Sequence, residues 1–195
     1  MEIPSELSPA KLLSLDVLQS QLQACGQGVK VYTGCRLYPP DRICVGDYSQ
    51  IDEGVRIYAG QGVTIGRYVH LAFDCSISGG GQCVIRDFAG LGAGVRLITG
   101  SENIDGSGLT NPTVPESLRR VERGQVIIGA HAVIFTNSIV LPGVTVGDGA
   151  VVSAGSVVHR DLKPWCVYAG NPLVQVGIRP RDNILRLAVP LNHEP

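Results

Sequence analysis

A six-residue spacing of aliphatic residues runs through most of the chain and limits what it can fold into. The spacing is six residues, with occasional steps of eight, and every position holds Ile, Leu or Val. The series comprises Val45, Ile51, Ile57, Ile65, Leu71, Ile77, Ile85, Leu91, Leu97, Ile128, Ile134, Val140, Val146, Val152 and Val158, with Val31 and Leu37 upstream. A helix would instead need apolar residues at i+3 and i+7, which are not systematically present. A fixed repeat of this kind predicts stacked units that share one core.

A second column, of small residues or Val, accompanies the aliphatic one. It lies four residues after each aliphatic position on two of every three units. Its members are Ser49, Val55, Val69, Cys75, Ala89, Val95, Ala132, Ser138, Ala150 and Ser156. Each unit is therefore one short strand plus a turn, and three units make a triangular coil with the aliphatic side chains inside. Because one coil cannot bury its own core, the coils must stack as parallel strands about 4.8 Å apart.

The departures from the six-residue spacing all fall at one corner of the predicted coil. The steps over residues 37–45, 57–65 and 77–85 are eight residues long, and the gap from Leu97 to Ile128 occurs at the same corner. Residues 98–127 are therefore expected to form a loop that projects from one edge. Loops longer than about 12–15 residues are usually functional or disordered. This one carries several apolar residues, so we expect it to be functional.

The repeat has a flanking segment at each end. Residues 5–24 predict a short amphipathic helix, with Ser8 as its N-cap and Pro9 at its first position. Such a helix could cover the open edge of the first coil. After Val158 the repeat ends. We expect an N-terminal helical cap over residues 1–28, a β-helix domain over 29–178 and a loose C-terminal tail over 179–195.

Charge and composition exclude several classes of protein. The 195 residues fit one domain, with 16 basic and 17 acidic residues and a net charge of −1, so the basic excess of a nucleic-acid-binding protein is missing. No apolar run reaches the roughly 18 residues of a membrane-spanning helix. The first residues lack the features of a signal peptide, which favours a cytoplasmic location. The six cysteines show no zinc spacing, so we expect reduced thiols and no metal.

Three segments resemble the hexapeptide-repeat acyltransferases: residues 140–147 (VLPGVTVG), 154–158 (AGSVV) and 168–172 (YAGNP). The resemblance covers about residues 29–178. Within the family, residues 100–103 (GSEN) and 109–115 (LTNPTVP) look most like O-antigen and nucleotide-sugar acetyltransferases. The resemblance implies an all-β fold, a left-handed parallel β-helix. It also implies acetyl-CoA as donor and a homotrimer, with active sites between neighbouring subunits that the projecting loop reaches.

Galactoside-type members of that family carry a catalytic histidine just after the strand that leads into the long loop. Counting hexads from Leu97 places Glu102 at this position, and aligning on Thr-Gly places Ser101 there, so the histidine is absent. An amine needs less help from a base than an alcohol does. We therefore interpret the acceptor as an amino sugar and Glu102 as the group that takes its proton. An ordinary solvated loop acid is an equally good reading of Glu102.

His70 is the second candidate base. It directly precedes inward-facing Leu71, so its side chain is expected to point outward, and exposed histidines without a function are common. Asp74, at the next turn, could orient the histidine or the substrate, and Asn103 and Asn111 are expected to bind substrate. His131, at a turn, is a weaker candidate.

The coenzyme A contacts are implied by the family resemblance, which places them in the late coils. The matching positions are Thr136, Ala154, Gly155, His159, Arg160 and Lys163. Arg160 and Lys163 are suited to meet phosphates. Simple hexad packing accounts equally well for Ala154 and Gly155.

The predicted function is acetyl transfer from acetyl-CoA to the amino group of a nucleotide-linked amino sugar in surface polysaccharide biosynthesis. The nearest alternative is O-acetylation of a sugar or small alcohol. Serine acetyltransferases usually have a longer N-terminal helical region than residues 1–28. The carbonic anhydrases with this fold need closely spaced zinc histidines, whereas the four histidines here are far apart in sequence. A non-enzymatic structural or binding module is the remaining alternative.

Overall fold

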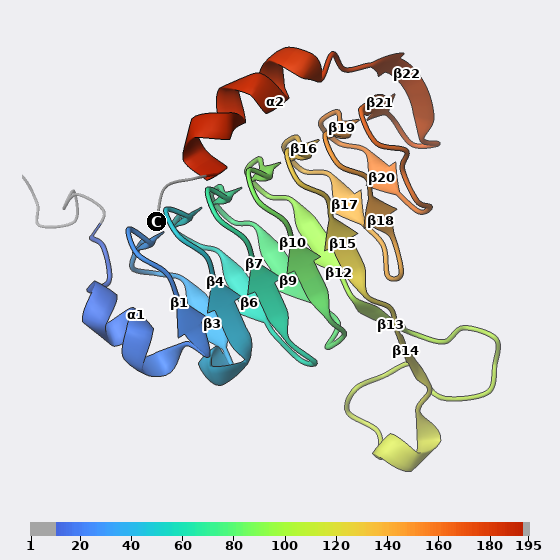
Figure 1. The fold of residues 1–195 in the computed structure, drawn as a ribbon. Coiled ribbons are helices and arrows are strands. Elements are labelled where there is room, and N and C mark those ends of the chain that lie inside the picture. Colours follow the sequence, from blue (N-terminus) through green and yellow to red (C-terminus); the bar gives the residue numbers. More distant parts are fainter. Residues whose placement is uncertain (1–10, 193–195) are drawn as a thin grey trace, which may run out of the picture.

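The computed structural model describes residues 11–192, which form a parallel β-helix of three sheets (Figure 1). The first sheet contains β1 (Ala24–Cys25), β4 (Ile43–Val45), β7 (Val63–Ile65), β10 (Cys83–Ile85), β15 (Val126–Ile128) and β18 (Thr145–Val146). The second contains β2 (Lys30–Val31), β5 (Gln50–Ile51), β8 (His70–Leu71), β11 (Gly90–Leu91), β16 (Val133–Ile134), β19 (Val151–Val152), β21 (Cys166–Ala169) and β22 (Val174–Ile178). The third contains β3 (Arg36–Tyr38), β6 (Arg56–Tyr58), β9 (Ser76–Ser78), β12 (Arg96–Ile98), β17 (Ile139–Val140) and β20 (Val157–Val158). The predicted β-helix is confirmed.

The aliphatic series forms the core, as its spacing predicts. Ile51, Leu71 and Leu91 pair in register on successive coils of the second sheet, and all three are buried. The small-residue column is buried with them. Burying one such aliphatic side chain contributes about 1.5–3 kcal/mol, so the repeated column is the main source of stability.

Two corners of the prism are built from residues in the left-handed backbone region. Between the second and third sheets these residues are Gly34, Gly54, Asp74, Gly94, Asn137 and Gly155, types that tolerate a positive φ. Between the first and second sheets they are Gly28, Tyr48, Tyr68, Phe88, His131, Gly149 and Trp165. Large side chains rarely adopt this conformation, but here they form a stack along the corner. We call Tyr48, Tyr68, Phe88, His131 and Trp165 the aromatic ladder.

The aromatic ladder follows from the coil period. Ring centroids are 5.0 Å apart for Tyr48 and Tyr68, 5.3 Å for Tyr68 and Phe88, and 4.8 Å for Phe88 and His131. Trp165 continues the column at 6.2 Å from His131, at the level where Gly149 leaves room for its ring. Aromatic stacking of this kind contributes about 0.5–1.5 kcal/mol per pair, which offsets the backbone strain.

Helix α1 (Leu15–Gln21) covers the first coil with Leu18 and Leu22, both buried. It is shorter than the helix predicted over residues 5–24. Its N-cap is Ser14, whereas the predicted cap at Ser8 and Pro9 lies outside the described residues. Residues 11–14 are not helical because Leu13 instead donates a backbone hydrogen bond to Val31 on the first coil.

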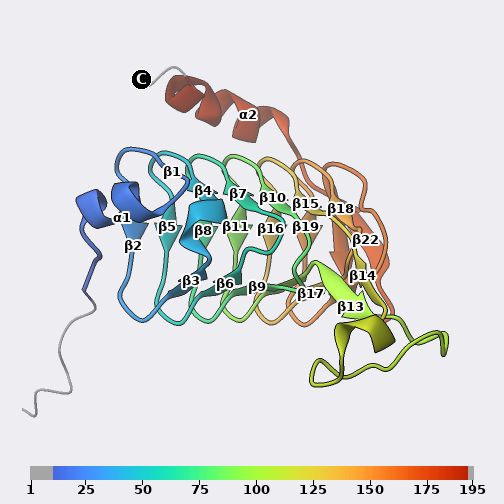
Figure 2. The same cartoon turned by 90° about the horizontal axis from the view of Figure 1, so that it is seen from below.

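The C-terminal segment differs from the loose tail predicted over residues 179–195. Strand β22 turns back antiparallel to β21, and helix α2 (Asp182–Ala188) then runs along the edge that carries the aromatic ladder, away from the projecting loop (Figure 2). Arg179 donates to the carbonyl of His131 at 2.7 Å, and Arg67 donates to that of Leu191 at 3.1 Å. These contacts hold the segment against the prism.

The long insertion projects from the corner between the third and first sheets, as the spacing predicts (Figure 1). Its base is a ribbon of two antiparallel strands, β13 (Gly100–Glu102) and β14 (Val121–Arg123), and a short 3₁₀ turn spans Glu116–Leu118. Thr99 joins the ribbon to the prism. Its buried hydroxyl donates to Ser78 and accepts from Gly81, both at 2.9 Å, and its carbonyl accepts from Gly124 at 3.0 Å.

Candidate active site

A cavity of about 600 Å³ lies where the ribbon leaves the prism. We call it the loop-root pocket. It is lined by Arg42, Tyr58, Gly60, Gln61, Gly79, Gly80, Gly100, Ser101, Glu102, Pro112, Arg119, Val121 and Arg123. One lining side chain is acidic and three are arginines, so the pocket favours an anionic ligand.

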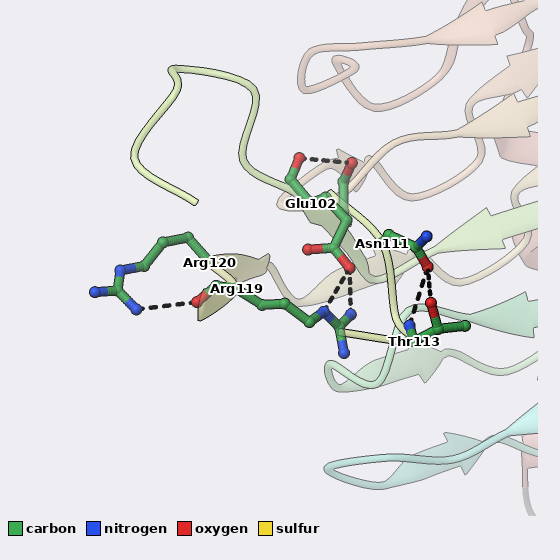
Figure 3. Close-up of polar contacts among 6 residues, drawn as sticks. Glu102, Asn111, Thr113, Arg119 and Arg120 are labelled. Carbon is green, nitrogen blue, oxygen red and sulfur yellow. Dashed lines mark hydrogen bonds and ion pairs between the residues drawn. The ribbon is translucent and has the colours of Figure 1, made fainter. Parts of the chain in front are cut away.

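Glu102 sits on the wall of this pocket in an ion pair with Arg119 (Figure 3). The Oε1 atom of Glu102 accepts from the arginine, including a bond from Nε at 3.1 Å. Its Oε2 atom is buried and has no hydrogen-bond partner among the described residues. A buried, unpaired carboxylate oxygen is rare, because burial without a hydrogen bond is costly. Such an oxygen can accept a hydrogen bond or a proton from a bound ligand.

The two asparagines predicted to bind substrate take part in local turns. Asn103 donates to Glu122 on the ribbon and accepts from the backbone of Asp105 at 2.7 Å. Asn111 accepts from the backbone and the hydroxyl of Thr113, at 3.0 Å and 2.9 Å (Figure 3). Neither asparagine lines the loop-root pocket, although Pro112 beside Asn111 does.

His70 lies on the outer face of the second sheet, as predicted, and has a partner that the sequence reasoning missed. Its Nε2 atom is 2.9 Å from Oδ2 of Asp52. The imidazole is half exposed, with 50% of its side chain accessible, whereas 7% of the Asp52 side chain is accessible. Gln50 donates to the other oxygen of Asp52 at 2.8 Å. The buried carboxylate can therefore orient the ring, the arrangement found in histidine bases.

Asp52 could have been found from the repeat. His70 pairs in register with Gln50, one coil earlier, and Asp52 lies two residues further along the chain. Both histidine and aspartate line a second hollow, of about 360 Å³, with Gln50, Tyr32, Glu53 and Phe73. Asp74 is exposed in the neighbouring turn, with φ 58°, and does not line this hollow.

Three of the residues assigned to coenzyme A lie close together at one corner. Gly155 donates its backbone N–H to the carbonyl of Thr136 at 2.9 Å, which places Ala154 and Gly155 one coil beyond Thr136. All three are exposed, and the space around the Gly155 α-carbon is open. This corner therefore offers backbone groups to a ligand without steric hindrance.

The other three cofactor candidates follow the last hexads. Arg160 is 5.8 Å from the ring centroid of Tyr168 and contacts the carbonyl of Leu173 at 3.4 Å. The backbone of Lys163 donates to the Tyr168 hydroxyl at 3.1 Å. His159 and Lys163 are exposed. The packing around Tyr168 thus fixes Arg160, and leaves the Lys163 side chain open to solvent.

The candidate residues are not gathered in one place within the chain. Glu102 belongs to the ribbon at the corner of the third and first sheets, and His70 belongs to the second sheet. The loop-root pocket contains Glu102 but no other candidate from the sequence. The pairing of Glu102 with Arg119 was not predicted, because the pairing of β13 with β14 is not encoded in the hexad spacing.

The remaining titratable groups play other parts. Burial raises the pKa of the Cys35 and Cys75 thiols to about 11 and that of Cys83 to about 12. These thiols are protonated at neutral pH and make poor nucleophiles. Burial, followed by the nearby charge of Arg179, lowers the pKa of His131. Over residues 11–192 no helix is long and apolar enough to span a membrane, and no cluster of three potential metal ligands occurs.

Known proteins resemble this chain in sequence and in structure. The family described as bacterial transferase hexapeptide (six repeats) matches residues 125–160. The dTDP-4-amino-4,6-dideoxy-D-glucose acyltransferase of Escherichia coli is 32% identical over 171 residues, which cover 87% of this chain and 89% of that protein. AntD, an N-acyltransferase from Bacillus cereus in complex with dTDP and 3-hydroxybutyryl-CoA, aligns with a TM-score of 0.86 at 29% identity, covering 93% of this chain and 96% of AntD.

A variant of AntD in complex with dTDP-4-amino-4,6-dideoxyglucose and coenzyme A aligns with a TM-score of 0.88 at 27% identity. That alignment covers 95% of this chain and 100% of the variant. The repeat, the sequence similarity over most of the chain and the overall structure agree, and the chain belongs to the hexapeptide-repeat acyltransferases.

Proposed function

We propose that this protein transfers an acyl group, acetyl in the simplest case, from acyl-CoA to the amino group of a nucleotide-linked amino sugar. The observation that carries this proposal is the unpaired, buried Oε2 of Glu102 in an arginine-lined pocket. A protonated amine can donate to such an oxygen, and the arginines suit the phosphates of a nucleotide. The similarity to acyltransferases of dTDP-linked amino sugars supports the same acceptor class.

In this mechanism Glu102 receives a proton from the sugar ammonium and leaves a neutral amine. The amine nitrogen attacks the thioester carbonyl carbon, forming a C–N bond and a tetrahedral oxyanion. Collapse of this intermediate breaks the C–S bond, and the sulfur of coenzyme A takes the second proton of the nitrogen. Arg119 fixes the carboxylate through Oε1, so Oε2 stays in position for the acceptor.

The wide separation of the candidate residues supports a site completed by a second subunit. Glu102 projects on the ribbon, whereas Thr136, Ala154 and Gly155 lie at another corner of the prism. In a homotrimer the ribbon of one subunit can meet the cofactor corner of its neighbour. Thr136, Ala154, Gly155, His159, Arg160 and Lys163 would then line the coenzyme A groove, as the family resemblance implies.

An acceptor panel tests the proposal. Purified protein is supplied with acetyl-CoA and nucleotide-linked amino sugars, or with their hydroxyl counterparts, and thiol release is followed. We expect turnover with amino sugars alone, and loss of it in Glu102→Ala but not in the control Glu116→Ala, which removes a carboxylate from the same loop outside the pocket. A longer donor such as 3-hydroxybutyryl-CoA, run in parallel, reports the acyl preference. Turnover with hydroxyl acceptors alone would contradict the proposal.

A second candidate function is O-acetylation, and the His70–Asp52 pair favours it. An alcohol needs a stronger base than an amine, and an imidazole held by a buried carboxylate supplies one. In that case His70→Ala, and not Glu102→Ala, abolishes turnover, and hydroxyl acceptors are the substrates. Absence both of turnover and of coenzyme A binding would instead indicate a structural module.

The substrates indicate where the proposed reaction occurs and what its product is used for. Acyl-CoA and nucleotide sugars are made in the cytoplasm, so we place the reaction there. An acylated nucleotide amino sugar is a precursor for glycosyl transfer, which fits the assembly of lipopolysaccharide or another surface polysaccharide. Sedimentation analysis of the purified chain tests the homotrimer.

A further inference from the structure

The outer face of the third sheet carries a column of arginines beside a pair of tyrosines. Arg36 pairs in register with Arg56, Arg56 with Ser76, and Ser76 with Arg96. On the same strands, β3 and β6, Tyr38 pairs with Tyr58 two residues after the arginines. Residues two apart on a strand point to the same face, so guanidinium groups and phenol rings share this surface. We call it the arginine face.

The arginines on this face concentrate positive charge on one surface. Arg36, Arg56 and Arg96 are exposed, and none forms an ion pair with another residue in the described range 11–192. Adjacent strands lie about 4.8 Å apart, so Arg36 and Arg56 repel each other. Like charges directly opposite on neighbouring strands are destabilising. A bound anion would remove this repulsion.

The tyrosines offer a flat surface next to these charges. The rings of Tyr38 and Tyr58 are stacked, with centroids 6.0 Å apart and planes inclined by 20°. They are 65% and 52% exposed, which is unusual for large aromatic residues on a sheet. Bases of nucleotides stack on exposed aromatic side chains without strong sequence preference. Aromatic rings beside guanidinium groups therefore match a nucleoside diphosphate.

The arginine face leads to the loop-root pocket. A hollow of about 390 Å³ is lined by Arg36, Tyr38, Arg56, Ile57, Tyr58, Ser76, Ile77 and Ser78. Tyr58 also lines the loop-root pocket, on whose wall Glu102 sits. Gly80 lines the loop-root pocket next to Tyr58 and Arg123, and its lack of a side chain leaves room beside Tyr58. A ligand that lies on the tyrosines can extend across Gly80 toward Glu102.

We propose that the arginine face binds the nucleoside diphosphate of the acceptor, with the base on Tyr38 or Tyr58 and the pyrophosphate on Arg36 and Arg56. Tyr58 lies between these arginines and the loop-root pocket, so the ligand bends at the pyrophosphate and its sugar passes Tyr58 into that pocket, with the amine near Glu102. Assigning this nucleotide to an acceptor sugar rests on the proposed function. Coenzyme A also contains a nucleoside diphosphate, but its candidate residues lie in the late coils. The adjoining cavity with Glu102 therefore favours the nucleotide sugar.

Equilibrium binding of two probes, dTDP and coenzyme A, tests the assignment without any turnover. The variant Arg36→Ala/Arg56→Ala should weaken dTDP binding by at least about tenfold, because two charge-assisted contacts are lost. Its affinity for coenzyme A should not change. The matched control, Arg181→Ala/Arg186→Ala, removes the same charge from the exposed C-terminal segment and should bind both probes as the wild type does.

Two tyrosine variants test the stacking. Tyr58→Ala should weaken dTDP binding about 5- to 100-fold, whereas Tyr58→Phe, which keeps the ring, should stay within about twofold. Thermal unfolding checks that each variant is folded, and loss of the arginine repulsion should leave the double variant at least as stable as the wild type.

Three results would overturn the inference: dTDP binding that is unchanged in the arginine variant, a weakening of coenzyme A binding and not of dTDP binding, or no dTDP binding by the wild type. Failure of the proposed function would give a different result. In that case dTDP still binds through the arginine face, and no amino sugar is acylated.

Discussion

The prism and the projecting loop are stabilised by different interactions within one chain. Prism residues such as Leu71 and Ile134 are buried in a continuous aliphatic core. Large apolar residues of the loop, including Ile104 and Leu109, are exposed, and polar contacts such as the Glu102–Arg119 pair and the Asn111 turn shape the backbone there. The prism therefore supplies most of the stability, and the loop can carry the proposed site at little cost to it.

A matched pair of truncations should give the largest contrast. Leu71→Ala removes a side chain that is 1% exposed, and should lower the free energy of unfolding by about 2–5 kcal/mol. Ile104→Ala removes one that is 91% exposed, and should change it by less than about 0.5 kcal/mol. Urea unfolding of both variants measures the difference. Comparable losses would mean that the loop has a core role that its exposure does not indicate.

The second prediction reverses the contrast, from stability to activity. Glu102→Gln keeps the shape of the side chain but removes the proton acceptor, so kcat should fall about 100-fold. The free energy of unfolding should fall by about 1 kcal/mol or less, because the amide oxygen of Gln can still accept the hydrogen bond from Arg119. Steady-state kinetics separates kcat from KM. An unchanged kcat with a raised KM would make Glu102 a binding residue.

Polar contacts provide a third, smaller comparison. In the prism, the carboxylate of Asp87 accepts from the backbone of Arg67 on the preceding coil at 2.8 Å. Asp87→Ala should cost about 1 kcal/mol, since it leaves that N–H without its partner. Asn111→Ala in the loop breaks comparable bonds to Thr113, but exposed groups there can turn to water, so stability should hardly change. Thermal unfolding of the two variants gives the comparison.

The same contrast explains what the sequence could predict. The core positions follow from the hexads, because each coil repeats the environment of the coil before it. The position of the loop follows from Leu97 and Ile128, where the series stops and resumes. The Glu102–Arg119 pair could not be predicted, because the loop has no period and its ribbon pairing depends on contacts between residues distant in sequence.

The site residues divide along the same line. The position of Asp52 beside His70 follows from the coil period, so this pair could have been predicted from the sequence. The aromatic ladder also follows the period, although positive φ values at Tyr68 and Phe88 contradict their local preference. The C-terminal segment, expected to be loose, has no repeat. Side-chain contacts such as that from Arg179 to the His131 carbonyl order it, and these are visible only in three dimensions.

The smallest predicted effect is a pH dependence of stability that arises in the aromatic ladder. In the folded chain, burial and the charge of Arg179 lower the pKa of His131 below its ordinary value of 6.5. Above pH 6.5 the imidazole is neutral in both states, so this group leaves stability unaffected. As the pH falls below 6.5, the unfolded chain binds a proton more readily than the folded chain, and stability is lost. Because solvent partly screens the ring, the loss should stay below about 0.5 kcal/mol.

His131→Phe isolates this effect. Phe88 shows that a phenyl ring fits the same left-handed position, one coil earlier in the ladder, so the stack should survive the change. Thermal unfolding of both proteins at pH 7.5 and pH 5 gives the comparison, and the wild type should lose more stability on acidification. His70 and His159 are present in both proteins, so their titration cancels. Equal losses would show that the aromatic ladder accommodates a charged imidazole as readily as water does. Stacking of the His131 ring, and not its neutral state, would then be what stabilises this corner.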